Sequence, residues 1–419
     1  MHERPLRPRA SLAILGGFFF LFGFVTWLNG TLIPYLQLAC ELTTFQALFV
    51  AFAFYIAYFV TALPGAWVLR RTGFKRGMSL GLLVMALGAL AFIPAAWSRT
   101  YALFLVGLFI IGTGLSLLQT AVNPYVTIIG PLESAARRIS IMGICNKVAG
   151  VLAPLVLGWI VLADADTVTA TLQALNEVER DAHLDAIALR VVVPYAIMAA
   201  ALTVLAVAVR WSPLPEVRPE APDTDAGAGG RAHVLHYPYL VLGVLALFVY
   251  VGAEVIAGDT IGTYARSQGI PLSRAKHMTS WTLAAMVVGY VLGIVAIPRY
   301  LSQRTALAGS AVAGVLFTAL AMATGGWASV LCIALLGLAN ALVWPAIWPL
   351  AIRDLGRHTS TGSALLIMAI AGGALLPLAY GHLADLPAVG PKAAYALLLP
   401  CYAFIGYYAL RGARLERWR

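Results

Sequence analysis

Residues 138–160 read RISIMGICNKVAGVLAPLVLGWI, an apolar run fit to cross a lipid bilayer, with one lysine, Lys147, in its middle. Lys147 follows Arg138 by nine residues, which at about 1.5 Å per helical residue puts it about 14 Å into a hydrocarbon core about 30 Å thick. A cation at that depth is costly unless it faces water or a counter-charge. Lys147 is therefore a candidate functional residue, although a lysine that snorkels to the interface or ties two helices together is the simpler alternative.

The composition excludes a water-soluble protein. Of the 419 residues, 61% are hydrophobic and 11% are charged, and the mean hydropathy is +0.86, as in polytopic membrane proteins. The formal charge of +10 falls in short clusters between apolar runs, so no nucleic-acid partner is expected. The four cysteines lie far apart in the sequence, which favours neither a disulfide framework nor a zinc site.

Twelve apolar segments are long enough to span a bilayer. They lie at roughly 11–37, 45–69, 77–97, 101–128, 138–163, 190–210, 238–265, 277–297, 305–324, 327–352, 361–384 and 392–410. Basic residues concentrate in alternate connecting segments, which places both termini in the cytoplasm by the positive-inside rule. One external loop, with Arg266, Arg274 and Lys276, goes against this bias. The first segment lacks a cleavage signal, so we expect a span rather than a signal peptide.

The connecting segments predict the domain organisation. Residues 164–189 are acidic, with apolar residues at helical spacing, and predict an external loop that contains a short amphipathic helix. Residues 211–236 contain four prolines and a Gly-Ala-Gly-Gly run, and predict a flexible cytoplasmic linker. We therefore expect an N-terminal bundle at 1–210, the linker at 211–236 and a C-terminal bundle at 237–419.

The two halves of the sequence repeat each other. NGTLIPY at 29–35 aligns with GDTIGTY at 258–264, and GVLAPLVLG at 150–158 aligns with GALLPLAYG at 373–381. Two weaker matches occur in the same order at similar offsets. The expected fold is therefore an all-α polytopic membrane protein whose two six-helix bundles are related by a pseudo-twofold axis along the membrane normal, as in transporters.

Polar residues recur at membrane depth. The fourth span carries Gln119 and Asn123 on one helical face, next to Pro124, which cannot continue the hydrogen-bond ladder. Amides pair with sugar hydroxyls and indole faces stack on pyranose rings, so these positions predict a site for a neutral polyol. Hydrogen bonding between helices is the alternative role for such amides. The candidate substrate-binding residues are Trp27, Asn29, Gln119, Asn123, Asn146, Lys147, Asn340, Trp344 and Trp348.

Two acids remain within the spans, Glu254 and Asp259, both in the seventh. Five residues apart, they lie about 140° apart around an ideal helix, so they need not share a face unless Gly258 breaks it. Asp259 is near the outer end, where pairing with Arg266 is a structural alternative to a functional role. Glu254 lies deeper and has no partner nearby in the sequence.

Several stretches carry a family resemblance. They are Leu28-Asn29 to Pro34, FYIAYF at 54–59 with LPG at 63–65, LFLVGLFI at 103–110, NPYV at 123–126 and YVGAE at 250–254. Together they resemble the fucose permease-like branch of the major facilitator superfamily, over essentially the whole chain. The resemblance implies a sugar:cation symporter that works by alternating access, located in a bacterial inner membrane.

The departures from that branch concern its titratable residues. Gly30 stands where the fucose permeases carry an aspartate, and Gln119 stands where they carry a glutamate. Gln119 is shared with the glucose/galactose branch. A bacterial subgroup that includes N-acetylglucosamine permeases has motifs similar to three others in this chain, WLNG at 27–30, ICNK at 144–147 and EVIAGD at 254–259. The resemblance also matches Asn146 to a sugar-binding asparagine and Trp344 to a tyrosine of the fucose permease.

We expect a secondary active importer of a neutral sugar, either N-acetylglucosamine or a hexose such as glucose or galactose. The expected partners are the sugar and membrane lipid, the chain is expected to act as a monomer, and a proton or sodium ion is expected in place of any cofactor. An uncoupled facilitator and an exporter of the same fold are the alternatives. A membrane enzyme is disfavoured because no metal pair, Ser/His set or phosphate loop is found.

The sequence also predicts a coupling device. Lys147 and an acid of the seventh span are expected to replace the carboxylates that the family carries at positions 30 and 119. Asp259 is the first candidate for this acid, because Gly30 falls opposite Asp259 in the internal repeat, and Glu254 is the second.

Overall fold

The computed structural model describes residues 8–128, 135–162, 165–212, 234–297, 300–353, 355 and 359–418. These residues form helices and contain no strand, and twelve of the helical segments are long and apolar enough to cross a membrane. The all-α fold and the multi-pass membrane character predicted from the sequence are therefore confirmed. The spans are Ile14–Ala39, Thr44–Leu69, Phe74–Trp97, Tyr101–Val122, Ile141–Val161, Glu177–Trp211, Pro238–Asp259, Leu272–Ala296, Gln303–Ala323, Gly326–Ile352, Ala364–Asp385 and Gly390–Arg414.

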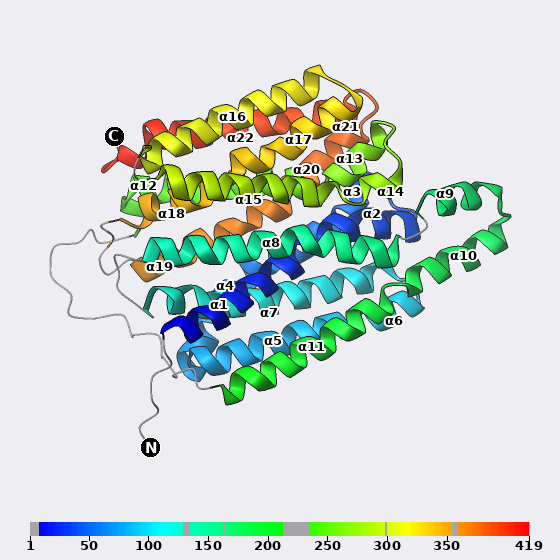
Figure 1. Ribbon diagram of the computed structural model, residues 1–419, viewed down its shortest axis with the longest axis horizontal. Helices are drawn as coiled ribbons and strands as arrows, with labels where there is room; N and C mark the ends of the chain where they lie inside the picture. The colour runs from blue at the N-terminus through cyan, green and yellow to red at the C-terminus, as the bar shows by residue number, and fades with distance from the viewer. Residues whose placement is uncertain are drawn as a thin grey trace.

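The helices divide between two sides of the molecule, which Figure 1 shows as a lower and an upper group. The first half consists of α1 (Pro8–Trp27), α2 (Asn29–Ala39), α3 (Thr44–Ala47), α4 (Phe49–Thr72), α5 (Phe74–Leu90), α6 (Phe92–Trp97), α7 (Tyr101–Ile128), α8 (Ala135–Val161), α9 (Ala165–Ala174), α10 (Glu177–Leu189) and α11 (Val192–Trp211). The second half consists of α12 (Pro238–Asp259), α13 (Ile261–Ser267), α14 (Leu272–Ala275), α15 (Met278–Ala296), α16 (Gln303–Ala323), α17 (Gly326–Asn340), α18 (Val343–Ile352), α19 (Thr359–Met368), α20 (Gly372–Asp385), α21 (Gly390–Ala394) and α22 (Leu398–Leu410). Four 3₁₀ turns complete it, at Val234–His236, Ala369–Ala371, Tyr395–Leu397 and Gly412–Arg414.

The helix α1 begins and α22 ends at the same end of the molecule, which we call the terminal end (Figure 1). At the opposite, distal end, α9 and α10 project beyond the other helices. The sequence predicts one amphipathic helix in this region, whereas the structure has two. Asn176 separates them, because its side chain accepts a 2.9 Å hydrogen bond from the Glu179 amide and so caps the start of α10. Most of the predicted linker lies outside the described residues.

Glycines allow the helices of the first half to pack at close range. In α5 and α7, Gly81 faces Gly114 and Gly88 faces Gly107, and a Cβ atom at any of the four would lie 2.5–3.0 Å from the backbone oxygen of its partner. Helix association within lipid gains little from the hydrophobic effect, so close backbone packing of small residues is a main source of stability. Large apolar side chains such as Leu87 and Ile197 are instead exposed on the outer surface, as expected for contact with lipid.

Several helices are interrupted within a membrane span or at its end. Leu28 separates α1 from α2 and residues 341–342 separate α17 from α18 inside their spans, whereas Thr260 separates α12 from α13 just beyond the end of the seventh span. The breaks at Leu28 and Thr260 lie within or next to the repeated stretches 29–35 and 258–264, beside Asn29 and Asp259. Broken helices expose backbone groups that can line a binding site, and transporters use them in this way.

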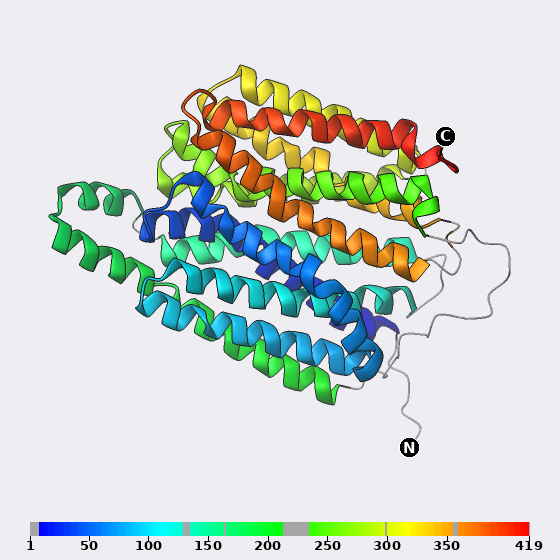
Figure 2. The ribbon, with the colours of Figure 1, turned by 180° about the vertical axis from the view of Figure 1, so that it is seen from behind.

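The two halves meet along two faces. The helix α8 packs against α15 (Figure 1), and α4 packs against α20 (Figure 2). Polar contacts close these faces at the distal end. The Phe45 amide donates a 2.7 Å hydrogen bond to Asp385, and Lys276 Nζ donates a 2.6 Å hydrogen bond to the Leu162 carbonyl. Ser280 donates a 2.7 Å hydrogen bond to the Val151 carbonyl.

Gly114→Leu should destabilise the protein, because the added side chain would force α7 away from α5; overpacking of this kind costs about 1–3 kcal/mol or more. Gly17→Leu is the matched control, since a Cβ atom at Gly17 has no neighbour within 4 Å. Thermal unfolding of the purified proteins in detergent measures the difference. Equal melting temperatures for the two variants would contradict the proposed role of the α5–α7 contact.

Candidate functional site

A buried ion pair joins the two halves at the middle of the molecule. Lys147 Nζ on α8 lies 2.6 Å from Glu254 Oε1 on α12, and each side chain is 10% exposed. Charge-assisted hydrogen bonds of this length are strong, and the pairing supplies the counter-charge that a midplane lysine needs. The acid that pairs with Lys147 is therefore Glu254, the second candidate of the sequence analysis, and not Asp259.

The indole of Trp27 lies directly beside this ion pair. Lys147 Nζ is 4.7 Å from the centroid of the ring, within the range of a cation–π interaction. The ring fits between the halves because two glycines make room for it. A Cβ atom would lie 2.6 Å from the ring at Gly150 and 2.4 Å from it at Gly258. Trp27 is thus held by α8 on one side and by α12 on the other.

The break after α12 is stabilised by threonines of α15. Carbonyl groups in the last turn of a helix lack intrahelical partners, and here the carbonyls of Gly258 and Ala257 accept hydrogen bonds from Thr279 (2.7 Å) and Thr282 (3.1 Å). The neighbouring Asp259 is fully buried. Neither of its carboxyl oxygens has a hydrogen-bond partner among the described residues, so the alternative pairing with Arg266 is wrong.

Two asparagines, one in each half, present unused donors. Asn29 begins α2 and Asn340 ends α17, and both residues are buried. Within the part of the chain that the structure describes, neither Nδ2 atom has a hydrogen-bond partner. Asn340 Oδ1 accepts a 3.0 Å hydrogen bond from the Tyr402 hydroxyl, so its amide group is held in place. Buried donors of this kind are rare in proteins and point to an absent partner.

The other amides have partners within the protein. Gln119 Nε2 donates a 3.0 Å hydrogen bond to the Tyr58 hydroxyl, and Asn146 Nδ2 donates to the Phe19 carbonyl at 3.3 Å. The contact of Asn146 joins α8 to α1, which is the structural role weighed for these amides. Asn123 lies in α7, but its side chain is outside the described residues.

The spans of both halves also carry candidate aromatic side chains. Trp344 and Trp348 stack at a centroid distance of 5.5 Å and an interplanar angle of 22°, so the indole faces expected from their spacing do lie side by side. The sequence analysis missed Tyr55 and Tyr250. Tyr55 packs against Gly373 across the interface between the halves, and the Tyr250 hydroxyl is within hydrogen-bonding range of Glu254. Both tyrosines lie in motifs that carry the family resemblance, FYIAYF and YVGAE. They were missed because a tyrosine in an apolar helix cannot be distinguished by sequence from a core residue.

The candidate residues therefore comprise amide donors without a partner among the described residues, aromatic faces, and one ion pair between the two bundles. Among the described residues, no group of three His, Cys, Asp or Glu side chains could hold a metal ion. Amides and aromatic rings can bind a polyhydroxylated molecule, and residues from both halves can release it when the halves separate.

Comparisons with known proteins agree with one another over most of the chain. The family model of the Major Facilitator Superfamily matches residues 15–377. The glucose/galactose transporter of Brucella abortus biovar 1 (strain 9-941) is 37% identical over 407 residues, which cover 96% of this chain and 93% of that protein. The L-fucose-proton symporter of Escherichia coli (strain K12) is 30% identical over 407 residues, covering 95% of this chain and 92% of the symporter. The crystal structure of the transporter FucP in the outward conformation matches with a TM-score of 0.73 and 28% identity, covering 95% of this chain and 97% of that one.

Lys147→Met should destabilise the protein by about 3–5 kcal/mol, because it leaves the Glu254 carboxylate buried without a partner. Adding Glu254→Gln should restore most of this loss, whereas adding Asp259→Asn should not. Thermal unfolding of the three variants in detergent provides the measurement. Equal recovery with either second substitution would show that Lys147 does not depend on Glu254 in particular.

Proposed function

The chain belongs to the Major Facilitator Superfamily, and from this premise we propose that it is a secondary active importer of a neutral sugar. The fold and the family expected from the sequence motifs are confirmed, and the relatives are transporters rather than enzymes. The proposed substrates are glucose, galactose or N-acetylglucosamine. The names of the glucose/galactose transporter and the L-fucose-proton symporter support a sugar as substrate.

The observation that carries the proposal is the pair of buried, unpaired amide donors of Asn29 and Asn340. A sugar hydroxyl can accept a hydrogen bond from each of them and donate one of its own to a carbonyl or carboxylate oxygen. An anionic substrate would need a basic partner, and the central lysine is already paired with Glu254. A wide apolar pocket, as expected for a drug exporter, would not need these amides.

The arrangement of the halves supports transport by alternating access. The contacts of Phe45, Lys276 and Ser280 at the distal end are hydrogen bonds between elements of opposite halves. Such contacts can break together when the halves rotate, and each bond is worth only about 0.5–3 kcal/mol. Sugar binding to groups in both halves can then favour one state over the other.

We further propose that a proton drives uptake and that Asp259 carries it. Among the described residues, none forms an ion pair or hydrogen bond with the buried carboxyl group of Asp259. An ionised carboxylate without a partner there would cost several kcal/mol, so the proposal requires the carboxyl group to hold a proton when the distal end closes over it. The Lys147–Glu254 pair holds the two halves together below it. A sodium ion as the coupling ion and uncoupled transport are the alternatives.

A substrate panel tests the sugar proposal. Cells that lack their own sugar transporters and express this chain should accumulate radiolabelled glucose, galactose or N-acetylglucosamine, but not gluconate. Asn29→Ala should lower the affinity for the accepted sugar by about 1–3 kcal/mol, because a sugar hydroxyl loses its donor, while the stability of the sugar-free protein should stay the same or rise.

Asn146→Ala is the matched control, since its amide holds the Phe19 carbonyl and its loss should lower the melting temperature as well. Uptake of gluconate in place of the neutral sugars would overturn the proposed substrate class. Unchanged affinity in Asn29→Ala would remove Asn29 from the binding site.

Asp259→Asn tests the coupling, because asparagine resembles the protonated carboxyl group but cannot release a proton. Membrane vesicles that contain this variant should exchange labelled for unlabelled sugar at a rate independent of pH. They should fail to accumulate sugar when a pH gradient is imposed, whereas vesicles with the native protein should accumulate it and lose it when a protonophore is added.

Accumulation by Asp259→Asn under a pH gradient would exclude Asp259 as the proton carrier. If the native protein accumulates sugar only under a sodium gradient, and a pH gradient has no effect, the coupling ion is sodium. Sugar equilibration with no accumulation under either gradient would identify a facilitator.

A further inference from the structure

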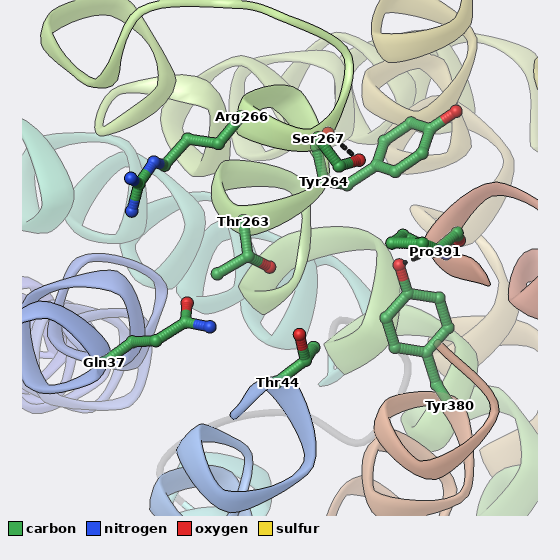
Figure 3. A pocket seen from close by; sticks show the side chains of 8 residues that line it. All are labelled: Gln37, Thr44, Thr263, Tyr264, Arg266, Ser267, Tyr380 and Pro391. Carbon is green, nitrogen blue, oxygen red and sulfur yellow. Dashed lines mark hydrogen bonds between the residues drawn. The ribbon is translucent and has the colours of Figure 1, made fainter. Parts of the chain in front are cut away.

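A polar cavity opens between the two halves at the distal end, away from the central ion pair. Its volume is about 290 Å³. Figure 3 shows Gln37 and Thr44 of the first half facing Thr263 of the second, with Arg266 on one side and Tyr380 on the other. Binding pockets for drug-sized ligands measure about 300–1,000 Å³, so this cavity is suited to one smaller molecule, such as a monosaccharide.

The same two broken helices run from the central site to this cavity. Gln37 follows Asn29 by eight residues along α2, and Thr263 follows Glu254 by nine residues along α12 and α13, so the distances along the helices are about 12 Å and 14 Å. Between the two places α2 and α13 touch. A Cβ atom at Gly262 would lie 3.8 Å from the Gly30 carbonyl oxygen and 3.9 Å from Pro34 Cγ. This contact lies between the central site and the cavity.

Three hydroxyl groups that line the cavity already donate hydrogen bonds to backbone carbonyl groups. Thr263 donates to the Thr260 carbonyl at 2.8 Å, Ser267 donates to the Tyr264 carbonyl at 2.7 Å, and Tyr380 donates to the Pro391 carbonyl at 3.2 Å. Their oxygens can therefore act toward a ligand only as acceptors. A ligand that binds here must donate hydrogen bonds.

Three other side chains supply donors. Gln37, Thr44 and Arg266 form no side-chain hydrogen bond or ion pair with the described residues. Burial lowers the pKa of Arg266, yet a guanidinium group stays charged in proteins. A partly desolvated cation without a counter-charge is stabilised by a ligand oxygen.

The mixture of donors and acceptors selects the ligand. A phosphate or sulfate ion offers acceptors to Arg266 but would face the lone pairs of Thr263 and Ser267. A sugar hydroxyl donates and accepts at once, so a pyranose matches both sets of groups. We propose that the distal cavity is a second sugar-binding subsite, a vestibule that holds one sugar molecule while the distal end is closed.

The inference rests on the proposed function, because it takes the transported neutral sugar as the ligand. Opening of the halves at the distal end would part Gly262 from Gly30 and Pro34 and let the sugar descend to the central amides. The vestibule sugar is therefore the next molecule to be carried, and its binding should not depend on the central site.

Protection of a cysteine against labelling tests the vestibule. Ser267→Cys places a thiol on the exposed rim of the cavity, and its rate of reaction with a small maleimide at pH 7 is measured with increasing D-glucose, D-galactose or N-acetyl-D-glucosamine. The native Cys40 at the same end reacts slowly, because burial raises the pKa of its thiol to about 11. Ser98→Cys, exposed at the distal end outside the cavity, should label at the same rate with and without sugar.

The transported sugar should protect Ser267→Cys equally well when Asn29→Ala and Asn340→Ala disable the central site. Adding Gln37→Leu should raise the half-protecting concentration at least tenfold. Loss of protection in the Asn29→Ala/Asn340→Ala background would overturn the vestibule, because the protection would then come from the central site. Protection by D-glucuronate alone would overturn a neutral sugar as its ligand. If the sugar is taken up but does not protect the introduced cysteine, the vestibule proposal is wrong and the proposed function stands. If the sugar is neither taken up nor protective, the proposed function is refuted.

Discussion

A charge in the hydrocarbon core must have a partner, and this requirement organises the middle of the molecule. Lys147 comes from the first half and Glu254 from the second, so neither half can bury its own charge alone. The ion pair therefore specifies how the two halves face each other, and Trp27 and Tyr250 pack around it. A buried pair of this kind gives orientation rather than net stability, since the cost of removing both charges from water offsets most of their attraction.

The space for this arrangement comes from residues without side chains. Gly150 and Gly258 admit the indole of Trp27, while Gly81 and Gly114 let α5 approach α7. The breaks at Leu28 and Thr260 then place Asn29 at the start of α2 and Asp259 at the end of α12. Among the described residues, the side-chain donor of Asn29 and the carboxyl group of Asp259 that lack hydrogen-bond partners therefore lie beside interruptions of the helices.

The sequence sufficed to identify the fold and to locate Lys147, because the depth of a residue within an apolar run is simple arithmetic. It could not identify the partner of Lys147, since that depends on where helices from different halves meet, and the internal repeat favoured Asp259. The two threonines that cap the end of α12 were also beyond prediction. They lie 21 and 25 residues from the carbonyls they bind, and no helical periodicity relates residues that far apart. Gln119, Asn146 and the tryptophan pair were recognised as polar or aromatic positions at depth, but whether an amide binds a ligand or a neighbouring helix is decided by packing.

Trp27 meets a glycine of each half at mid-height, Gly150 of α8 and Gly258 of α12, and packs in one cluster with Leu283, Met286 and Tyr290 of α15. A ring held between the two halves in this way can act as a pivot about which the bundles rock. Motion about a pivot halfway along a rigid beam is equal and opposite at its two ends. On this geometry, tightening of the distal end loosens the terminal end by a similar amount.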